Sequence, residues 1–148
     1  MSQQDDHQQL VVFTLGAEHY ALPIQAVNEI IRYSEPRSVA SRTDWVRGVI
    51  SLRGRIVPVY DVAARLGLSS ELTEQSKIVI VETGTETAGV IVDTVEEVLT
   101  VSAQQIEEAP GADSTMIEAI VRIDDKLVVL LTLGAIFSDG ADLAAAAA

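Results

Sequence analysis

Residues 46–61 read Val-Arg-Gly-Val-Ile-Ser-Leu-Arg-Gly-Arg-Ile-Val-Pro-Val-Tyr-Asp, and this stretch decides the fold class. Two apolar runs, residues 46–52 and 55–59, bracket the dipeptide Arg53-Gly54, a pattern typical of a β-hairpin. Pro58 lies inside the second run, and because proline cannot donate a ladder hydrogen bond, it predicts an edge strand. The stretch therefore predicts short antiparallel strands joined by a tight turn.

Three further pairs of apolar runs have the same form, and they flank Gly16, Gly84 and residues 124–126. Val and Ile together number 32, against 13 Leu, and β-branched residues favour strands over helices. Helices are expected to be few and brief, at residues 23–27, at 61–66 with Asp61 as N-cap, and at 102–106 with Ser102 as cap. The sequence thus predicts an all-β fold of antiparallel barrels or a sandwich.

The composition limits what the chain can be. It has 148 residues, no cysteine and a net charge of −12. A disulfide framework, an iron–sulfur cluster and a thiol nucleophile are therefore excluded, and the acidic balance argues against nucleic acid as a partner. The apolar runs fall short of the roughly 20 residues that span a bilayer, and residues 1–9 do not resemble a signal peptide, which predicts a cytoplasmic protein without membrane insertion. We expect a disordered N-terminus over residues 1–8, one folded unit of two lobes over 9–137, and a mobile tail over 138–148.

Charge is distributed unevenly along the chain. Residues 32–65 contain seven arginines and three acidic residues, a net charge of +4. Residues 66–118 contain one lysine and eleven acidic residues, a net charge of −10. Two interpretations stay open: solvated surface, or a pair of oppositely charged faces that steer docking to proteins.

Catalytic groups are scarce. The two histidines, His7 and His19, are not spaced with other ligand types, so no metal site and no cofactor are predicted. Residues 48–54 are rich in glycine but lack the Lys-Ser/Thr of a phosphate-binding loop. One enzymatic alternative stays open, a small carboxylate-dependent hydrolase or carbohydrate-binding barrel that would use the acidic residues Glu96, Glu97, Glu107 or Glu108. The sequence otherwise predicts a protein that is not an enzyme.

Two charged residues stand among apolar neighbours. Arg53 lies at the predicted turn, where it either pairs with a nearby carboxylate or contacts a partner protein. Glu29 is an acid within the apolar stripe of Val27, Ile30 and Ile31, which is read either as core or as partner surface.

At this point the motifs match a family. Residues 48–61 closely resemble Gly-x-x-x-Leu-Arg-Gly-x-Ile-x-Pro-x-x-Asp, the signature of CheW-like chemotaxis adaptors. Supporting matches are Phe13-Thr-Leu-Gly, Tyr20-Ala-Leu-Pro-Ile and Gly89-Val-Ile-Val-Asp, and the resemblance runs in order from about Leu10 to Phe137. It implies two small SH3-like five-stranded β-barrels packed together.

The resemblance also implies a non-catalytic role. Proteins of this family couple the cytoplasmic tips of methyl-accepting chemoreceptors to the regulatory domain of a CheA-type histidine kinase, at membrane-associated receptor arrays. The receptor tip helix would dock in an apolar groove between the barrels, with the candidates Val27, Glu29, Ile30, Gly48, Arg53, Val90, Val92 and Val98. The kinase would meet the basic segment with Arg37, Arg42, Thr43, Asp44 and Arg47.

Two positions depart from the family pattern. Ser51 stands where many relatives carry Asn, and Arg55 takes a commonly aliphatic position. A specialised adaptor for a non-flagellar system such as twitching motility is therefore an alternative. A regulatory domain cut from a kinase is another, against which the start at Met1 argues.

Overall fold

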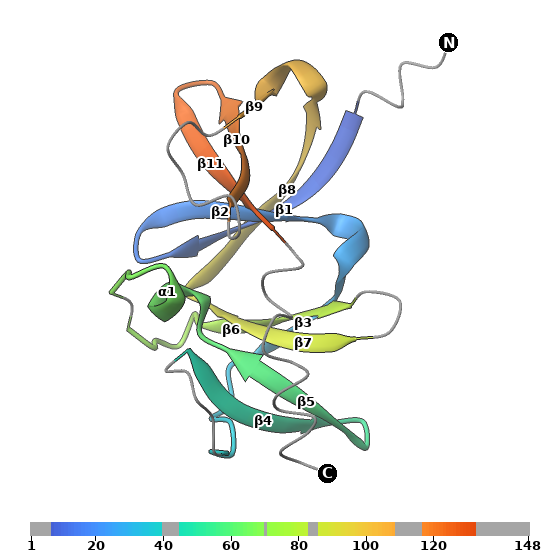
Figure 1. Ribbon diagram of the computed structural model, residues 1–148, viewed down its shortest axis with the longest axis vertical. Helices are drawn as coiled ribbons and strands as arrows, with labels where there is room; N and C mark the ends of the chain where they lie inside the picture. Colours follow the sequence, from blue (N-terminus) through green and yellow to red (C-terminus); the bar gives the residue numbers. More distant parts are fainter. Residues whose placement is uncertain (1–6, 40–44, 70, 83–85, 109–116, 133–148) are drawn as a thin grey trace.

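A computed structural model of the chain describes residues 7–39, 45–69, 71–82, 86–108 and 117–132. Within these ranges the chain forms eleven strands, one short α-helix and two 3-10 turns, arranged as two lobes (Figure 1). The first strand begins at His7 and ends at Leu15. Residues 7 and 8, which were expected to belong to a disordered N-terminus, are its first two residues. Residues 1–6 and the expected tail 138–148 lie outside the described ranges.

The first lobe contains both ends of the described chain. Its six strands follow the order β8-β1-β2-β11-β10-β9, and β2 and β11 are the parallel pair among antiparallel neighbours. The 3-10 turn η3 (Ala103–Gln105) carries the chain from β8 to β9. The strands are β1 (His7–Leu15), β2 (Glu18–Pro23), β8 (Thr94–Ser102), β9 (Ile106–Glu107), β10 (Ile117–Ile123) and β11 (Lys126–Leu131).

The second lobe is a five-stranded sheet in the order β3-β6-β7-β5-β4. Its two outer strands are brought together by an isolated bridge, in which Arg37 and Val49 exchange backbone hydrogen bonds of 2.8 and 2.9 Å. The sheet is thereby curled into a small barrel. The strands are β3 (Val27–Arg32), β4 (Val46–Leu52), β5 (Arg55–Tyr60), β6 (Lys77–Glu82) and β7 (Thr87–Val92).

All four predicted hairpins are confirmed, as β1–β2, β4–β5, β6–β7 and β10–β11. The prediction that Pro58 marks an edge strand is wrong, because β5 lies between β4 and β7. Pro58 is tolerated there because Val49, its partner on β4, uses its N–H and C=O for Arg37. The parallel ladder to β7 involves only Val59 and Tyr60, so the missing N–H of Pro58 breaks no ladder hydrogen bond.

The three brief helical turns also form where their caps predict them. The turn η2 (Ile24–Ala26) follows Pro23, and η3 is preceded by Ser102 in a capping box with Gln105. The helix α1 (Val62–Arg65) has Asp61 as N-cap, whose Oδ1 accepts a hydrogen bond of 3.1 Å from the Ala64 N–H.

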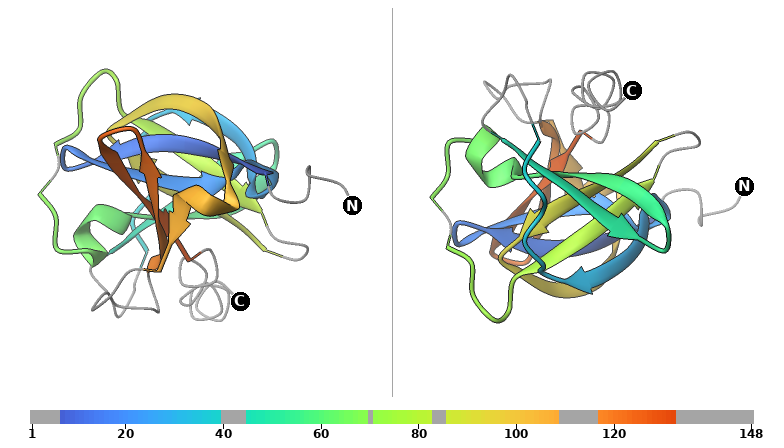
Figure 2. Two further views of the ribbon diagram at one scale, coloured as in Figure 1. Left: turned by 90° about the horizontal axis from the view of Figure 1, so that it is seen from above. Right: turned by 90° about the horizontal axis from the view of Figure 1, so that it is seen from below.

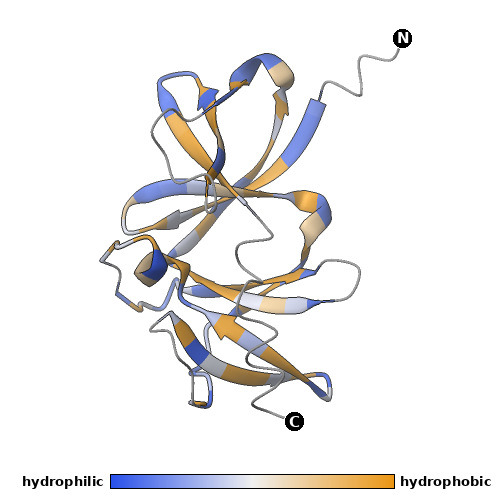
Figure 3. Cartoon of the chain, in the orientation of Figure 1, coloured by the Kyte–Doolittle hydropathy of each residue, from blue (hydrophilic) through white to orange (hydrophobic). Residues whose placement is uncertain are grey.

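The lobes share one apolar core. Its buried members come from β1 and β2 of the first lobe, such as Phe13 and Leu22, and from β6 and β7 of the second, such as Val81 and Val90. Each lobe also has one smaller apolar cluster of its own. Coloured by hydropathy, apolar and polar residues alternate along many of the strands, as half-buried strands require (Figure 3). The shared core holds the two lobes together as one unit. A site on its surface can therefore include residues from both lobes.

Candidate functional site

The site is built around an ion pair between Glu29 on β3 and Arg53 at the β4–β5 turn. The Arg53 Nη2 donates to Glu29 Oε2 over 2.8 Å, and Nη1 donates to the other carboxylate oxygen. The hydrogen bonds from Arg53 hold the pKa of the Glu29 carboxyl below its usual value, and the same bonds raise the pKa of Arg53. The Arg53 side chain is 72% exposed, so one side of this fork is available to a partner.

The backbone at the turn is unusual for an arginine. Arg53 has a φ of 52°, and Gly54 follows with a φ of 79°. This left-handed pair is the geometry of a tight hairpin turn, in which the first position favours Asn, Asp or Gly. Arg53 therefore holds an unfavourable backbone conformation at the position from which its side chain reaches Glu29.

Two of the aliphatic candidates are exposed. Ile30 on β3 is 40% exposed and Val98 on β8 is 51% exposed, while Val27 is half-buried and packs on the shared core. β3 and β8 belong to different lobes but run along the same side of the molecule, as the views from above and below show (Figure 2). The exposed candidates therefore come from both lobes.

The sequence reasoning missed Ile56, which is 71% exposed on β5 beside the Arg53 turn. Its neighbours Val57, Val59 and Tyr60 are buried, so exposure is confined to the start of the strand. The apolar run of residues 56–60 has no polar residue that marks Ile56 as exposed, so the sequence pattern carried no signal for it.

Three groove candidates are not on the surface, and for them the prediction is corrected. Val90 and Val92 are fully buried in the shared core, because their face of β7 packs against the first lobe. Gly48 is buried too, with a φ of 142°, and a Cβ there would lie 2.0 Å from the Arg37 carbonyl oxygen. Gly48 is thus required by the close approach of two backbones, not by a partner.

The kinase candidates are only partly described. Arg37 is exposed and pairs through its backbone with Val49, and Arg47 lies nearby on β4. Arg42, Thr43 and Asp44 lie outside the described residues. Arg47 donates from Nε and Nη2 to Asp61 Oδ2 over 3.1 and 2.6 Å, so much of its charge is compensated.

Several arginines of the basic stretch, residues 32–65, already have partners within the chain. All of its described arginines lie in the second lobe, but Arg47 and Arg53 are paired with carboxylates and Arg55 donates to Thr87 over 3.2 Å. The acidic stretch runs through both lobes, from β6 to β10. The alternation of charge along the sequence therefore does not become two uniform opposite faces.

The carboxylates of the enzymatic alternative are distributed over different strands of the first lobe. Glu107 accepts a 2.7 Å hydrogen bond from Arg122, which lowers the pKa of Glu107, the opposite of what a general acid needs. Glu96 lies 3.7 Å from His19, and both side chains are partly exposed. Within the described ranges, no three His, Asp or Glu side chains come together as a metal site would require, and no helix has the length and hydropathy to cross a membrane.

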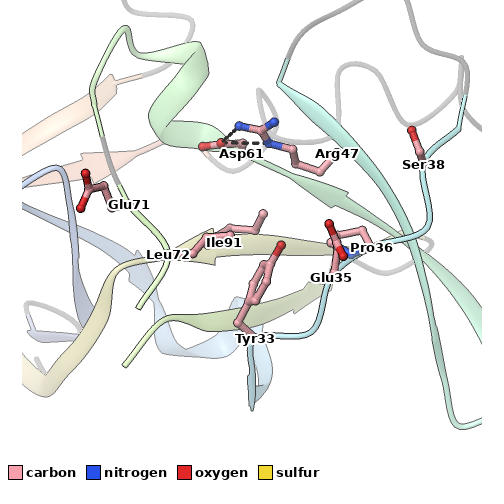
Figure 4. A pocket seen from close by; sticks show the side chains of 9 residues that line it. All are labelled: Tyr33, Glu35, Pro36, Ser38, Arg47, Asp61, Glu71, Leu72 and Ile91. Carbon is pink, nitrogen blue, oxygen red and sulfur yellow. Dashed lines mark hydrogen bonds and ion pairs between the residues drawn. The ribbon is translucent and has the colours of Figure 1, made fainter. Parts of the chain in front are cut away.

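A cavity of about 540 Å³ opens beside the Arg47–Asp61 pair. Figure 4 shows the Tyr33 hydroxyl and the Glu35 carboxylate on one side of it, and Glu71 at the opposite margin with its carboxylate turned outward. Its other lining residues are Pro36, Ser38, Leu72 and Ile91. The sequence reasoning did not single out this cavity, because its walls come from five separate parts of the chain.

The comparison that decides the family covers almost the whole fold: the model of the CheW-like domain matches residues 9–141. The chain belongs to the CheW-like family. It is 31% identical to the chemotaxis protein CheW of Bacillus subtilis over 134 residues, which cover 87% of this chain and 86% of that protein. It is 30% identical to CheW of Klebsiella aerogenes over 136 residues, covering 88% and 82% of the two chains.

A solved structure of the same family has the same architecture. The scaffolding protein TtCheW from Thermoanaerobacter tengcongensis superposes with a TM-score of 0.83 at 33% identity, covering 88% of this chain and 92% of that one. The two lobes are therefore the two SH3-like barrels of the CheW fold, as expected. With these relatives, the chain is a chemotaxis coupling adaptor that takes part in signalling complexes.

Proposed function

We propose that this adaptor is non-catalytic and couples the cytoplasmic tip of a methyl-accepting chemoreceptor to the regulatory domain of a CheA-type histidine kinase at receptor arrays. The observation that carries the proposal is the Glu29–Arg53 fork, with its Arg53 side chain 72% exposed, together with exposed aliphatic side chains on strands of both lobes. Such a surface suits a protein partner, because apolar side chains supply contact area while a charged pair sets orientation.

The receptor side of the proposal uses an amphipathic helix as ligand. Ile30 and Val98 would contact its apolar stripe, with Val27 beneath them and Ile56 at the margin of the surface. Glu29 and Arg53 would select its register by hydrogen bonds to polar groups of the helix. Val90, Val92 and Gly48 support this surface from below and make no contact with the receptor.

The kinase side is assigned to the second lobe near the Arg37–Val49 bridge. Arg37 is exposed there, and the Arg47 side chain is 52% exposed despite its bond to Asp61. The Arg37 guanidinium would attract an acidic group on the kinase domain, whereas Arg47 would contribute less because Asp61 compensates its charge. Arg42, Thr43 and Asp44 remain candidates for the same contact.

Reconstitution tests the coupling directly. We expect the autophosphorylation rate of a CheA-type kinase to rise on addition of this protein only when receptor tips are present, and to stay unchanged with the adaptor alone. Unchanged kinase activity in the complete mixture would contradict the proposal.

A charge-reversal series locates the receptor contact. Arg53→Glu should abolish the activation while the circular dichroism spectrum stays that of the folded protein, because Arg53 is exposed. Arg122→Glu, which breaks the exposed pair with Glu107 on the first lobe, is the matched control and should activate normally. If both variants lost activity equally, net charge and not the Arg53 site would be responsible.

One comparison favours a second partner system. The chain is 32% identical to the protein PilI of Pseudomonas aeruginosa over 84 residues, which cover 56% of this chain and 47% of that protein. We propose a non-flagellar array, such as one for twitching motility, as the second candidate. Deleting the gene and scoring swimming against twitching separates the two, since only the coupled behaviour should be lost.

A further inference from the structure

We propose that the cavity beside the Arg47–Asp61 pair is a docking pocket for an arginine side chain presented by a partner protein. It lies at a different place from the Glu29–Arg53 surface and shares only Arg47 with the candidate kinase contact. The proposal concerns the binding chemistry of the isolated protein, so it stands or fails separately from the coupling function.

The cavity has an apolar floor. Leu72 is 58% exposed, although it is a large aliphatic residue, and Ile91 is 7% exposed on β7. Pro36 and the ring of Tyr33 complete the apolar part of the lining. At about 540 Å³ the space is larger than one side chain, so it can admit an extended stem together with part of its backbone.

The polar groups around this floor leave negative charge uncompensated. Three carboxylates line the cavity, Glu35, Asp61 and Glu71, against the single guanidinium of Arg47. Asp61 accepts both of the hydrogen bonds from Arg47, and it also caps α1. Glu35 and Glu71 make no hydrogen bond or ion pair with any residue in the described ranges, so the lining carries a net charge of −2 at neutral pH.

A hydroxyl adds a third polar group. Tyr33 points its hydroxyl into the cavity, on the same side as the Glu35 carboxylate (Figure 4). Desolvation raises the pKa of Tyr33, with Glu35 and Asp61 adding to the effect and Arg47 opposing it, so this hydroxyl stays protonated and electrically coupled to the same carboxylates.

This combination fits one occupant. An arginine side chain has an apolar stem for Leu72 and Ile91. Its planar cation donates hydrogen bonds to carboxylates and stacks on an aromatic ring such as that of Tyr33. Arg47 does not repel it strongly, because Asp61 compensates its charge. An acidic side chain would be repelled by the net negative charge of the lining, and a purely aliphatic one would gain nothing from it.

The test is a titration of the ¹⁵N-labelled full chain at constant ionic strength. The probe is N-acetyl-L-arginine amide, which models arginine within a polypeptide, and the control is N-acetyl-L-citrulline amide, which has nearly the same shape without the charge. We expect saturable amide shifts around Tyr33, Asp61 and Ile91 with a millimolar Kd for the arginine probe alone. Shifts that do not saturate, or equal shifts with citrulline, would overturn the proposal.

Charge removal at the cavity gives the second readout. The double variant Glu35→Gln/Glu71→Gln should weaken arginine binding about fivefold or more. Glu97→Gln/Glu118→Gln removes the same charge from exposed sites on the first lobe and should leave the Kd unchanged. Equal weakening by both variants would show that the effect is general electrostatics. Tighter saturable binding of spermidine than of the arginine probe would assign the cavity to a free polyamine. Either result would contradict the docking of an arginine side chain.

Discussion

Arg53 donates hydrogen bonds from both terminal nitrogens to the two carboxylate oxygens of Glu29, a residue 24 positions earlier in the chain. The pair lies at the surface, where ion pairs contribute little to the stability of a fold. Arg53 also holds a left-handed backbone that costs free energy in the folded state. A costly backbone conformation that supports an exposed ion pair indicates that Arg53 serves binding. Substitutions at Arg53 can separate the backbone strain from the function of the side chain.

Replacing Arg53 by glycine separates backbone strain from side-chain function. Arg53→Gly should raise the Tm by a few degrees, because glycine adopts a positive φ without cost, yet weaken receptor binding about tenfold or more through loss of the fork. Ala17→Gly is the matched control: Ala17 has a φ of 75° in the β1–β2 turn, so this change should add about 1 kcal/mol to the free energy of unfolding and leave receptor binding unchanged. Thermal melts and a receptor-tip binding assay measure both, and a loss of stability in Arg53→Gly would contradict the strain.

Gly48 should be the least replaceable glycine of the second lobe. A Cβ there meets the Arg37 carbonyl oxygen at 2.0 Å, so Gly48→Ala must push the Arg37–Val49 bridge apart and should lower the free energy of unfolding by roughly 2–4 kcal/mol. Gly54→Ala is the comparison, since Gly54 has a φ of 79° but no atom within 4 Å of its Cβ position, and its cost should be about 1 kcal/mol. Urea unfolding gives both values; equal costs would show that close approach at Gly48 is unimportant.

Asp61 caps α1 and pairs with Arg47, and substitution by asparagine or alanine distinguishes these two roles. Asp61→Asn keeps an oxygen for the Ala64 N–H but loses the ionic bonds from Arg47, whereas Asp61→Ala loses both and should be less stable than Asp61→Asn by about 1 kcal/mol. In an Arg47→Met background the Asp61→Asn change should cost less, since the ionic partner is already gone. Equal stabilities of the asparagine and alanine variants would show that the cap contributes nothing.

Glu29 should titrate below the ordinary glutamate range. Its hydrogen bonds from Arg53 lower the pKa in the folded state from 4.5, so the pair contributes its full stability above pH 4.5 and loses it as the pH falls through the lower folded value. An NMR titration of the Glu29 side-chain carboxyl carbon measures this, and Arg53→Gln should return its pKa toward 4.5.

The Glu107–Arg122 pair is the internal control, because its pKa shift has the same direction and cause. Arg122→Gln should restore the pKa of Glu107 without moving that of Glu29. If the pKa of Glu29 were the same in the Arg53→Gln variant as in the original chain, the ion pair between Glu29 and Arg53 would be contradicted.

Local features of this fold were predictable from the sequence. The four hairpins and three helical turns depend on residues next to each other, such as Gly54 after Arg53 or Asp61 before α1, and these bonds close within a few positions. Motif matching also identified Glu29 and Arg53, although only as separate residues. That they bond to each other depends on the curl of the second barrel.

The errors share one physical cause. Pro58, Val90 and Val92 were assigned by local pattern to an edge and a groove, but exposure depends on which strands become neighbours. In the folded chain Val90 and Val92 pack in the shared core on one face of β7 and Ile91 packs in the second lobe's own cluster on the other, so both faces of the strand are covered. The continuous apolar run of residues 88–92 was itself a signal of a fully buried strand.

The sequence alone determined the strands, their turns and caps, the all-β class and the family, because alternation, turn residues and motif order act over short distances. The tertiary structure decided which charges are free. Arg47 and Arg53 count as two cations in the sequence, but folding places a carboxylate against each, and it leaves Glu35 and Glu71 lining a cavity without a cation from the described residues. Electrostatic pairing acts through space, and only the closed barrel brings those residues to hydrogen-bonding distance.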